Sequence, residues 1–497
     1  MKREMLALAA CACGAWAFGK VQLATPFADG MVLQRGAKTA VWGTAAAGEK
    51  VTVEFAGQSV SATAGADGRW LVRLAPMEAS KEGRMLRAND ATVSDVLVGE
   101  VWFCCGQSNT ELPLVGDNPH FSDREGRLLA AMTRLPYVRF AYASNYRWSV
   151  TPRDRAAYPV AWKTFTPENL GTAPSFSAMG VSFAIALYNA LDIPVGIVGS
   201  YWGGTNIDAW TPREGYADAP ASLKETAEYP VVTADKWNDA CKKGPIHGPQ
   251  QQPCVLWNEM VAPWCPMTMK GFIWYQGCHN GSEPHLYCDK MHALYRGWST
   301  KFENPDLKLY FVQLAPWKFS WWNLNAAQAK FAAEEKNAGM VISADVGNSA
   351  DIHPVDKGPL GRRLAALALN RDYGFEGLVA DSPTVRAVRA EGDRLVLSFN
   401  HANGWYVYNF DWTLGVPFEL AGEDGVWHPA VLVNANQGMT EPKEWVTNGR
   451  VNGRDLVLRA EGVAAPKRVR YLFNAPWTGN VYADSGLPLG QFESGLK

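Results

Sequence analysis

The chain has 497 residues, 47% of them hydrophobic and 19% charged. At about 150 residues per domain, this length predicts about three domains. The composition excludes a disordered chain, and the formal net charge of −2 argues against nucleic acid as a partner. The 21 tryptophans are unusual. Each ring can pack in a core or contact a sugar ring, and core packing is the more common role.

The N-terminus carries a basic start and a short apolar segment that ends in the small-x-small pattern AWA at residues 15–17. This pattern predicts a signal peptide over residues 1–17, cleaved after Ala17, and therefore a secreted or periplasmic protein. A lipoprotein site with Cys11 lipidated is the alternative, but its apolar core would span only residues 5–10. No other apolar run is long enough to span a bilayer.

The hydrophobic pattern divides the rest of the chain into three regions. Residues 18–95 alternate polar and apolar side chains between glycine turns, which predicts an N-terminal β-domain. Over 96–375, apolar strand-like runs alternate with helical runs such as 176–191, which predicts an α/β domain with a mostly parallel sheet. A polar stretch at about 213–252 is interpreted as an insertion in it. Residues 376–497 predict a C-terminal β-domain.

Five strands of the α/β domain are expected at residues 96–103, 194–198, 271–275, 307–314 and 340–344. Four of them are followed by polar segments: GQSN, WGGTNIDAW, WYQGCHNG and DVGNSADIHP. Ligands bind beyond the carboxyl ends of the strands in open α/β sheets. We therefore expect these four segments to converge.

The four segments contain the components of serine acyl transfer: Ser108, Gly203 and Gly204, Gln276 and Asn280, and Asp351 with His353. A serine hydroxyl needs an imidazole to take its proton, and the imidazole needs a carboxylate to orient it. Backbone N–H groups or side-chain amides must stabilise the oxyanion. Ser108 alone could be a turn residue, but the four segments in this order favour a catalytic role.

The order GQSN … WGGTNIDAW … IWYQG … DIHP resembles the sialate O-acetylesterase-like family of SGNH hydrolases, which is related to bacterial acetylxylan esterases. The similarity extends from FADGMVLQR near the start to NVYADSGLPLGQF near the end. The resemblance implies a three-layer α/β/α SGNH-hydrolase fold with a mostly parallel sheet, flanked by the two β-domains.

By this resemblance Ser108 is the nucleophile, His353 is the general base and Asp351 is the acid that orients the histidine. The implied oxyanion donors are the N–H of Ser108, Gly204 (with Gly203 as the alternative) and an amide of Gln276 or Asn280. The expected substrate contacts are Gln107, Asn109, Trp317 and Trp322. Together with Trp321, these two tryptophans could form a sugar-stacking wall or pack beneath a loop, and the sequence leaves both roles open.

The chain departs from the family pattern at three places. GQSNM reads GQSNT, which changes a wall residue at Thr110, and QGESN reads QGCHN, which places Cys278 where the family has a glutamate. LREAQ reads LNAAQ at 324–328 and loses an arginine suited to an acidic substrate. Asp351 stands two residues before His353, where a spacing of three is common in SGNH enzymes. Because Cys278 replaces the family glutamate, Asp351 becomes the main candidate for the carboxylate that orients His353.

A cluster of thiols and imidazoles follows the third strand: Cys278, His279, His285, Cys288 and His292. In a helix over 284–298 the last three would share one face. Their spacing matches no zinc pattern, so ordinary helix-face residues are the favoured interpretation, and neither a metal nor an organic cofactor is predicted. Seven of the nine cysteines remain after signal cleavage, and this odd number leaves a thiol free or paired between chains.

Together these patterns and the resemblance predict an exported carbohydrate esterase, and the resemblance implies that it removes O-acetyl groups from sialic acids of glycans. The reaction would pass through an acetyl-Ser108 intermediate that water hydrolyses, and the partner is an O-acetylated glycan or sialic acid. An acetylxylan or general acetyl-sugar esterase is the enzymatic alternative. The non-enzymatic alternative is a glycan-binding protein with a decayed hydrolase site. Cys278 favours this alternative, whereas the retained Ser108 and His353 argue against it.

Overall fold

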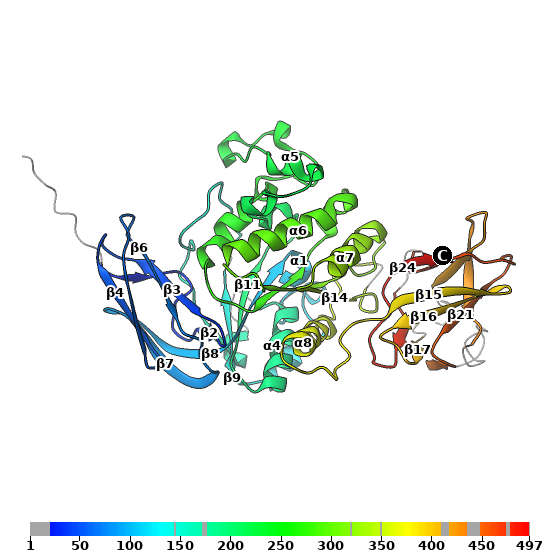
Figure 1. Cartoon of the computed structure of the whole chain (residues 1–497), viewed down its shortest axis with the longest axis horizontal. Coiled ribbons are helices and arrows are strands. Elements are labelled where there is room, and N and C mark those ends of the chain that lie inside the picture. The colour runs from blue at the N-terminus through cyan, green and yellow to red at the C-terminus, as the bar shows by residue number, and fades with distance from the viewer. Residues whose placement is uncertain are drawn as a thin grey trace, which may run out of the picture.

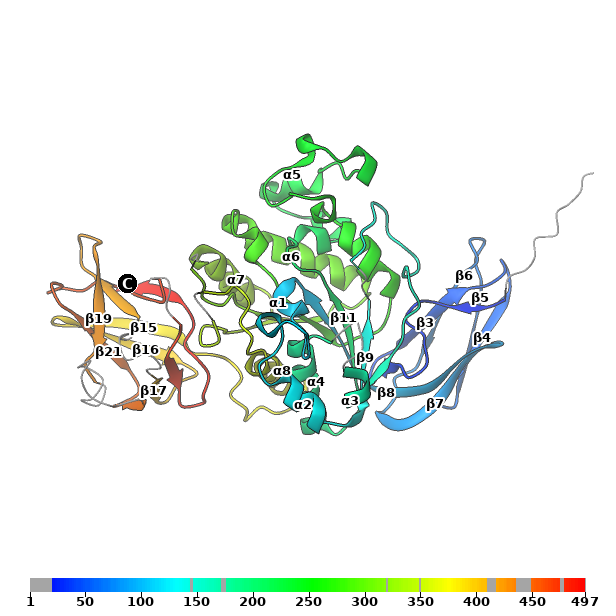
Figure 2. The same cartoon turned by 180° about the vertical axis from the view of Figure 1, so that it is seen from behind.

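In the computed structural model the chain forms a central α/β region between an N-terminal and a C-terminal β-region, arranged along its longest axis (Figure 1 and Figure 2). The structure describes residues 20–143, 146–170, 176–318, 321–347, 350–408, 417–434, 448–473 and 478–496. The expected signal peptide at 1–17 and Cys11 lie outside these residues. Within them, no helix has both the length and the apolar character needed to cross a membrane.

The centre of the molecule is a mixed sheet in the order β10 (Lys163–Phe165), β9 (Leu135–Tyr142), β11 (Val195–Tyr201), β8 (Ala91–Gly106), β12 (Gly271–Tyr275), β13 (Lys308–Val312) and β14 (Ala338–Val341). All neighbours from β9 to β14 are parallel, and β10 is antiparallel to β9. The five expected strands correspond to β8, β11, β12, β13 and β14. The sequence pattern did not predict β9, because Arg139 interrupts the apolar run of this strand. The structure buries this arginine, which bonds Asp95 at 2.8 Å and Gly30 O at 2.9 Å.

The described helices are α1 (Ser108–Glu111), α2 (Gly126–Met132), α3 (Pro167–Leu170), α4 (Ala178–Leu191), α5 (Lys224–Ala227), α6 (Pro284–Lys301), α7 (Trp322–Glu334) and α8 (Gly358–Asp372). The pairs α4–α8 and α6–α7 cover opposite faces of the sheet (Figure 1). Trp102 of β8 packs on Phe183 of α4, and the next residue, Phe103, packs on Trp298 of α6. Alternate strand residues point to opposite faces, so β8 is enclosed on both sides.

β8 is one continuous strand that leaves the N-terminal β-region and becomes the middle of the central sheet. The boundary expected at 95/96 lies inside it, where partly exposed residues give way to the fully buried run 96–106. The other strands of this region are β1 (Gln22–Leu23), β2 (Val32–Gln34), β3 (Thr39–Thr44), β4 (Lys50–Phe55), β5 (Gln58–Thr63), β6 (Arg69–Leu74) and β7 (Ser80–Ala88).

The C-terminal β-region has its own apolar core between two antiparallel sheets. The larger sheet runs in the order β15 (Thr384–Glu391), β16 (Arg394–Asn400), β21 (Leu456–Ala460), β19 (Trp427–Leu432), β18 (Phe418–Ala421), β22 (Arg468–Tyr471) and β24 (Phe492–Gly495). The smaller sheet runs β20 (Asn448–Val451), β17 (Trp405–Tyr408) and β23 (Val481–Ala483). The insertion expected at 213–252 contains short helical turns and α5, and it lies over α6 (Figure 1).

Candidate active site

The turn after β8 presents Ser108, which is half-buried, as the first residue of α1. Gly106 has φ = 142°, and a Cβ there would lie 2.4 Å from Tyr275 O, so the turn requires glycine. The buried hydroxyl of Thr110 lies 3.0 Å from the same oxygen and 3.2 Å from Cys105 O. Thr110 therefore braces the turn against β12 and is not the wall residue expected from the sequence.

His353, in the loop before α8, faces Ser108. Its Nε2 lies 3.0 Å from Ser108 Oγ, and its Nδ1 lies 3.4 Å from Asp351 Oδ1, which also accepts the His353 backbone N–H at 2.8 Å. The Phe121 ring packs edge-on against the imidazole. Burial lowers the pKa of His353, and the negative charge of Asp351 opposes this shift. The neutral imidazole is therefore favoured, and this is the form that can accept a proton from serine.

Asn109 and Lys357 tie the serine turn to the histidine loop. Asn109 Nδ2 donates to Ile352 O, in the residue before His353, at 3.0 Å. The buried Lys357 donates from Nζ to Asn109 Oδ1 at 2.6 Å, and its backbone N–H donates to Asp123 Oδ2 at 3.0 Å. Burial lowers the pKa of Lys357 to about 7. Asn109, expected to contact substrate, is instead a buried brace between the two loops.

The glycine turn after β11 lies against Ser108. A Cβ on Gly203 would be 3.2 Å from Ser108 Cβ, whereas Gly204, with φ = 67°, borders open space. The Gly203 N–H donates to Glu111 Oε2 at 2.7 Å. Burial raises the pKa of the Glu111 carboxyl, and hydrogen bonds from Tyr146 and Gly203 oppose this shift. Sequence reasoning missed Glu111, although its i+3 spacing from Ser108 places both on one face of α1.

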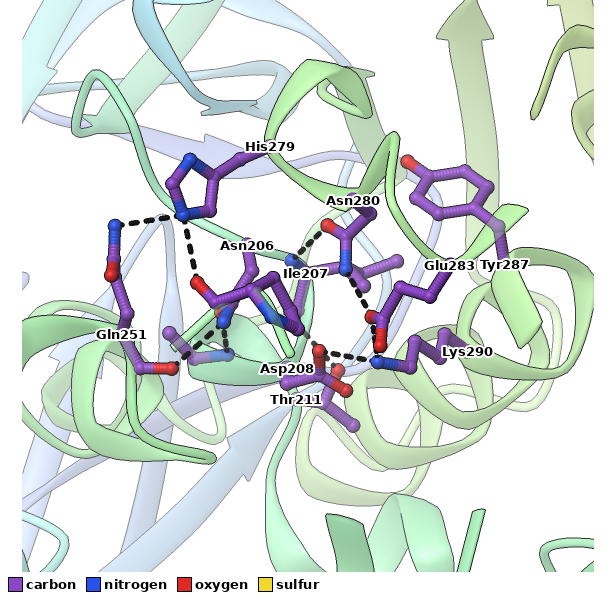
Figure 3. Close-up of polar contacts among 12 residues, drawn as sticks. Asn206, Ile207, Asp208, Thr211, Gln251, His279, Asn280, Glu283, Tyr287 and Lys290 are labelled. Carbon is purple, nitrogen blue, oxygen red and sulfur yellow. Dashed lines mark hydrogen bonds and ion pairs between the residues drawn. The ribbon is translucent and has the colours of Figure 1, made fainter. Parts of the chain in front are cut away.

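Gln276 and Asn280 are fully buried scaffold residues, which corrects their expected place in the oxyanion hole. Gln276 Nε2 donates to Thr205 O at 3.0 Å and to Asn280 Oδ1 at 2.8 Å, so both of its amide hydrogens are used. Asn280 Nδ2 donates to Glu283 Oε1 at 2.8 Å, and its Oδ1 also accepts the Ile207 N–H at 3.0 Å (Figure 3). These amides hold the segment after β11 against the end of β12.

The end of the insertion supports the same glycine turn through Gln251, which also contacts Asn206 and His279 (Figure 3). Gln251 Nε2 donates to Gly204 O at 2.7 Å, and the Gln251 carbonyl accepts from Asn206 Nδ2 at 2.9 Å. His279 Nε2 lies 2.9 Å from Gln251 Nε2 and 2.8 Å from Pro245 O. Burial lowers the pKa of His279. His279 therefore fastens the insertion to the segment after β12.

Two further positions of the family segments are filled by buried or uncharged groups. Gln107 is 3% exposed, and its Oε1 accepts the Gly277 N–H at 3.2 Å, so it joins two loops instead of facing a substrate. Burial raises the pKa of the Cys278 thiol to about 12. The position at which the family has glutamate thus carries an uncharged thiol. All seven cysteines of the described residues are free.

The two tryptophans expected to contact sugar lie in different surroundings. Trp322, the first residue of α7, packs on Phe473 of the C-terminal β-region with ring centroids 5.2 Å apart, so it links α7 to that region. Trp317 stacks on Trp321 with centroids 5.9 Å apart and planes 18° apart. Trp321 in turn covers Gly281, where a Cβ would lie 2.6 Å from the ring. Trp317 stays a predicted glycan contact near the end of the segment after β12.

Comparisons with known proteins agree on one class. Residues 250–370 match the family profile described as "SASA: Carbohydrate esterase, sialic acid-specific acetylesterase". The crystal structure of a carbohydrate acetylesterase from Xanthomonas citri has 30% sequence identity and a TM-score of 0.77, covering 95% of this chain and 99% of that chain. The sialate O-acetylesterase of Rattus norvegicus is 28% identical over 431 residues, 74% of this chain and 77% of the relative. That of Homo sapiens is 31% identical over 289 residues, 55% of this chain and 51% of the relative.

The shared fold and these matches define the class of the protein, which is a carbohydrate esterase. Within that class, the chain belongs to the carbohydrate acetylesterase family of the Xanthomonas citri enzyme, and its residues 250–370 match the sialic acid-specific acetylesterase profile. The profile match runs from the end of the insertion to α8, so it contains His353, and the likeness to the Xanthomonas citri structure extends over nearly the whole chain.

Replacement of Lys357 by Met should lower kcat roughly ten- to a hundredfold, because the loop that carries His353 loses its brace. KM should change little, and the melting temperature should stay close to that of the parent. Asn109→Ala should have a similar effect, and the double variant should be no worse than either single variant. Steady-state ester hydrolysis and thermal melts measure both properties, with the exposed Lys336→Met as the control.

Additive losses of kcat in the double variant would contradict a common route through the Asn109 side chain. A fall in melting temperature that accounts for the lost activity would reduce Lys357 to a purely structural residue.

Proposed function

We propose that the chain removes O-acetyl groups from sialic acids by a serine mechanism. Ser108 attacks the ester carbonyl while His353 takes its proton, and the 3.0 Å separation of Ser108 Oγ and His353 Nε2 is the observation that carries this proposal. Asp351, 3.4 Å from His353 Nδ1, stabilises the imidazolium. His353 then returns the proton to the leaving sugar hydroxyl. Water, deprotonated by the same histidine, hydrolyses the acetyl-Ser108 ester.

The proposed oxyanion donors are the backbone N–H groups of Ser108 and Gly204. The neighbouring Gly203 N–H is bonded to Glu111, which supports Gly204 as the donor of this turn. A positive φ and open space around Gly204 support close approach of a substrate to the backbone there. In other serine hydrolases a single donor of this kind contributes about 3 kcal/mol to transition-state stabilisation.

The family profile and the curated relatives support an O-acetylated sialic acid as the acyl donor. The Xanthomonas citri relative is described more broadly as a carbohydrate acetylesterase, which supports acetylated neutral sugars as the competing substrates. We place the glycan next to Ser108, with the stacked rings of Trp317 and Trp321 as the candidate sugar surface.

We assign this chemistry to a three-layer SGNH-hydrolase domain over residues 96–375, with β-domains at 18–95 and 376–497. The parallel strands from β9 to β14 and the helix pairs on both faces of the sheet support this assignment. The basic and apolar pattern of residues 1–17 supports export of the chain.

Ser108→Ala and His353→Ala should each lower kcat for acetate release from O-acetylated sialic acid by at least about a thousandfold, because each removes one half of the proton-transfer pair. The double variant should be little worse than either single variant, since the pair acts as a unit. Acetate release from O-acetylated sialic acid, acetylated xylan and a chromogenic acetyl ester measures this. The exposed Ser222→Ala is the matched control, and thermal melts check folding.

Near-parental turnover by Ser108→Ala would refute the serine mechanism. A higher kcat/KM on acetylated xylan than on O-acetylated sialic acid would refute the substrate and leave the mechanism intact. Binding of acetylated glycan by a parental protein without turnover would favour the glycan-binding alternative.

The pH dependence of kcat/KM should show an acid limb with its midpoint below about 6.5, the ordinary pKa of histidine. Activity requires neutral His353, and burial lowers the pKa of this imidazole, so the active form persists to lower pH. Asp351→Asn should move the midpoint lower still, because it removes the negative charge that favours the imidazolium, and it should also lower the plateau. A midpoint above 7, or an Asp351→Asn profile identical to the parental one, would contradict this assignment.

A further inference from the structure

A thiol, an imidazole and a carboxylate meet where α6 packs against α7. Cys288 and His292 stand four residues apart on one face of α6, and Glu334 is the last residue of α7. Their sulfur, nitrogen and oxygen atoms lie within 4.8 Å of one another. Among the described residues, this group contains Glu334 in place of the exposed His285, which the sequence placed on the same helix face. Residue spacing along α6 could not indicate that α7 supplies the third ligand.

Two of the three separations match the edges of a zinc tetrahedron. His292 Nε2 lies 3.1 Å from Glu334 Oε2, and Cys288 Sγ lies 3.4 Å from the same oxygen. Zinc bonds of about 2.0 Å to nitrogen and oxygen and about 2.3 Å to sulfur place N–O pairs about 3.3 Å apart and S–O pairs about 3.5 Å apart. A zinc ion would therefore need only small shifts in these two pairs.

The surroundings hold the ligands and leave one side open. The Phe331 ring packs edge-on against His292, with centroids 4.8 Å apart, and fixes the imidazole with Nε2 toward Glu334. Cys288 is 5% exposed, whereas the side chains of His292 and Glu334 are 29% and 42% exposed. A metal ion can reach the group from solvent, and a water molecule can complete the tetrahedron.

The nearby Lys330 bonds the opposite carboxylate oxygen. Its Nζ lies 2.7 Å from Glu334 Oε1 and 3.5 Å from Cys288 Sγ, so Oε2 remains directed at Cys288 and His292. A metal ligand must be deprotonated, so a bound metal would displace the Cys288 thiol proton, and Lys330 would stay as an outer partner of the carboxylate.

We propose that Cys288, His292 and Glu334 form a zinc site, with water as the fourth ligand, which links α6 to α7. The combination of thiolate, imidazole and carboxylate suits Zn²⁺, whereas Mg²⁺ and Ca²⁺ prefer oxygen ligands alone. α6 follows the segment after β12, and α7 lies between β13 and β14 in the chain, so the ion fastens two helices of one layer. This site is independent of the proposed esterase mechanism.

Cobalt(II) added to the whole protein tests the proposal, because a thiolate ligand gives a charge-transfer band in the near ultraviolet. We expect one bound cobalt per chain, displaced by one equivalent of zinc. Cys288→Ser should abolish the band, and Cys241→Ser, at another free cysteine, should keep it. His292→Ala and Glu334→Gln should each weaken cobalt binding at least about tenfold. Thermal melts and ester turnover establish that each variant is folded.

Absence of a thiolate band from the parental protein in excess cobalt would overturn the zinc site. A band that persists in a folded Cys288→Ser variant, or that disappears in Cys241→Ser, would also overturn it, because the ligand thiol would then lie elsewhere.

Discussion

The hydrogen bond between His353 Nε2 and Ser108 Oγ joins segments 245 residues apart in the chain. These segments do not follow neighbouring strands: β12 and β13 lie between β8, which leads to Ser108, and β14, which precedes the histidine loop. The parallel sheet brings both segments to the same edge, but their separation depends on buried polar contacts. Asn109 reaches the backbone of the histidine loop, and Lys357 holds the Asn109 amide from the start of α8.

Much of the polar sequence around the site holds loops together instead of facing a substrate. Four buried amide side chains have this role: Gln107, Asn109, Gln276 and Asn280. An amide carries both donors and acceptors, so one side chain can satisfy backbone groups of two irregular segments that have no ladder of their own. The groups that remain for the proposed chemistry are the Ser108 hydroxyl, the backbone N–H groups beside it, and the His353 imidazole with Asp351.

The strands that carry the site could be predicted from the sequence, because each is a short apolar run that ends in glycine or polar residues. β12 has its expected bounds, whereas β9 contains Arg139, whose burial depends on tertiary contacts with Asp95 and Gly30. The sequence motifs also predicted that Ser108 and His353 lie close together at the site. It could not show whether an amide such as Gln276 donates to a substrate or to a neighbouring loop, because both roles need the same residue type. Lys357 was missed because its partners lie on distant segments.

A fluorophosphonate probe tests the activation of Ser108 most directly, because it forms a stable covalent bond with a serine whose hydroxyl is deprotonated by a neighbouring base. Intact-mass measurement followed by peptide mapping should find one label per chain, located on Ser108, with labelling strongly slowed in a folded His353→Ala variant. A label on another residue, or no label in a protein that continues to hydrolyse acetyl esters, would contradict the serine mechanism.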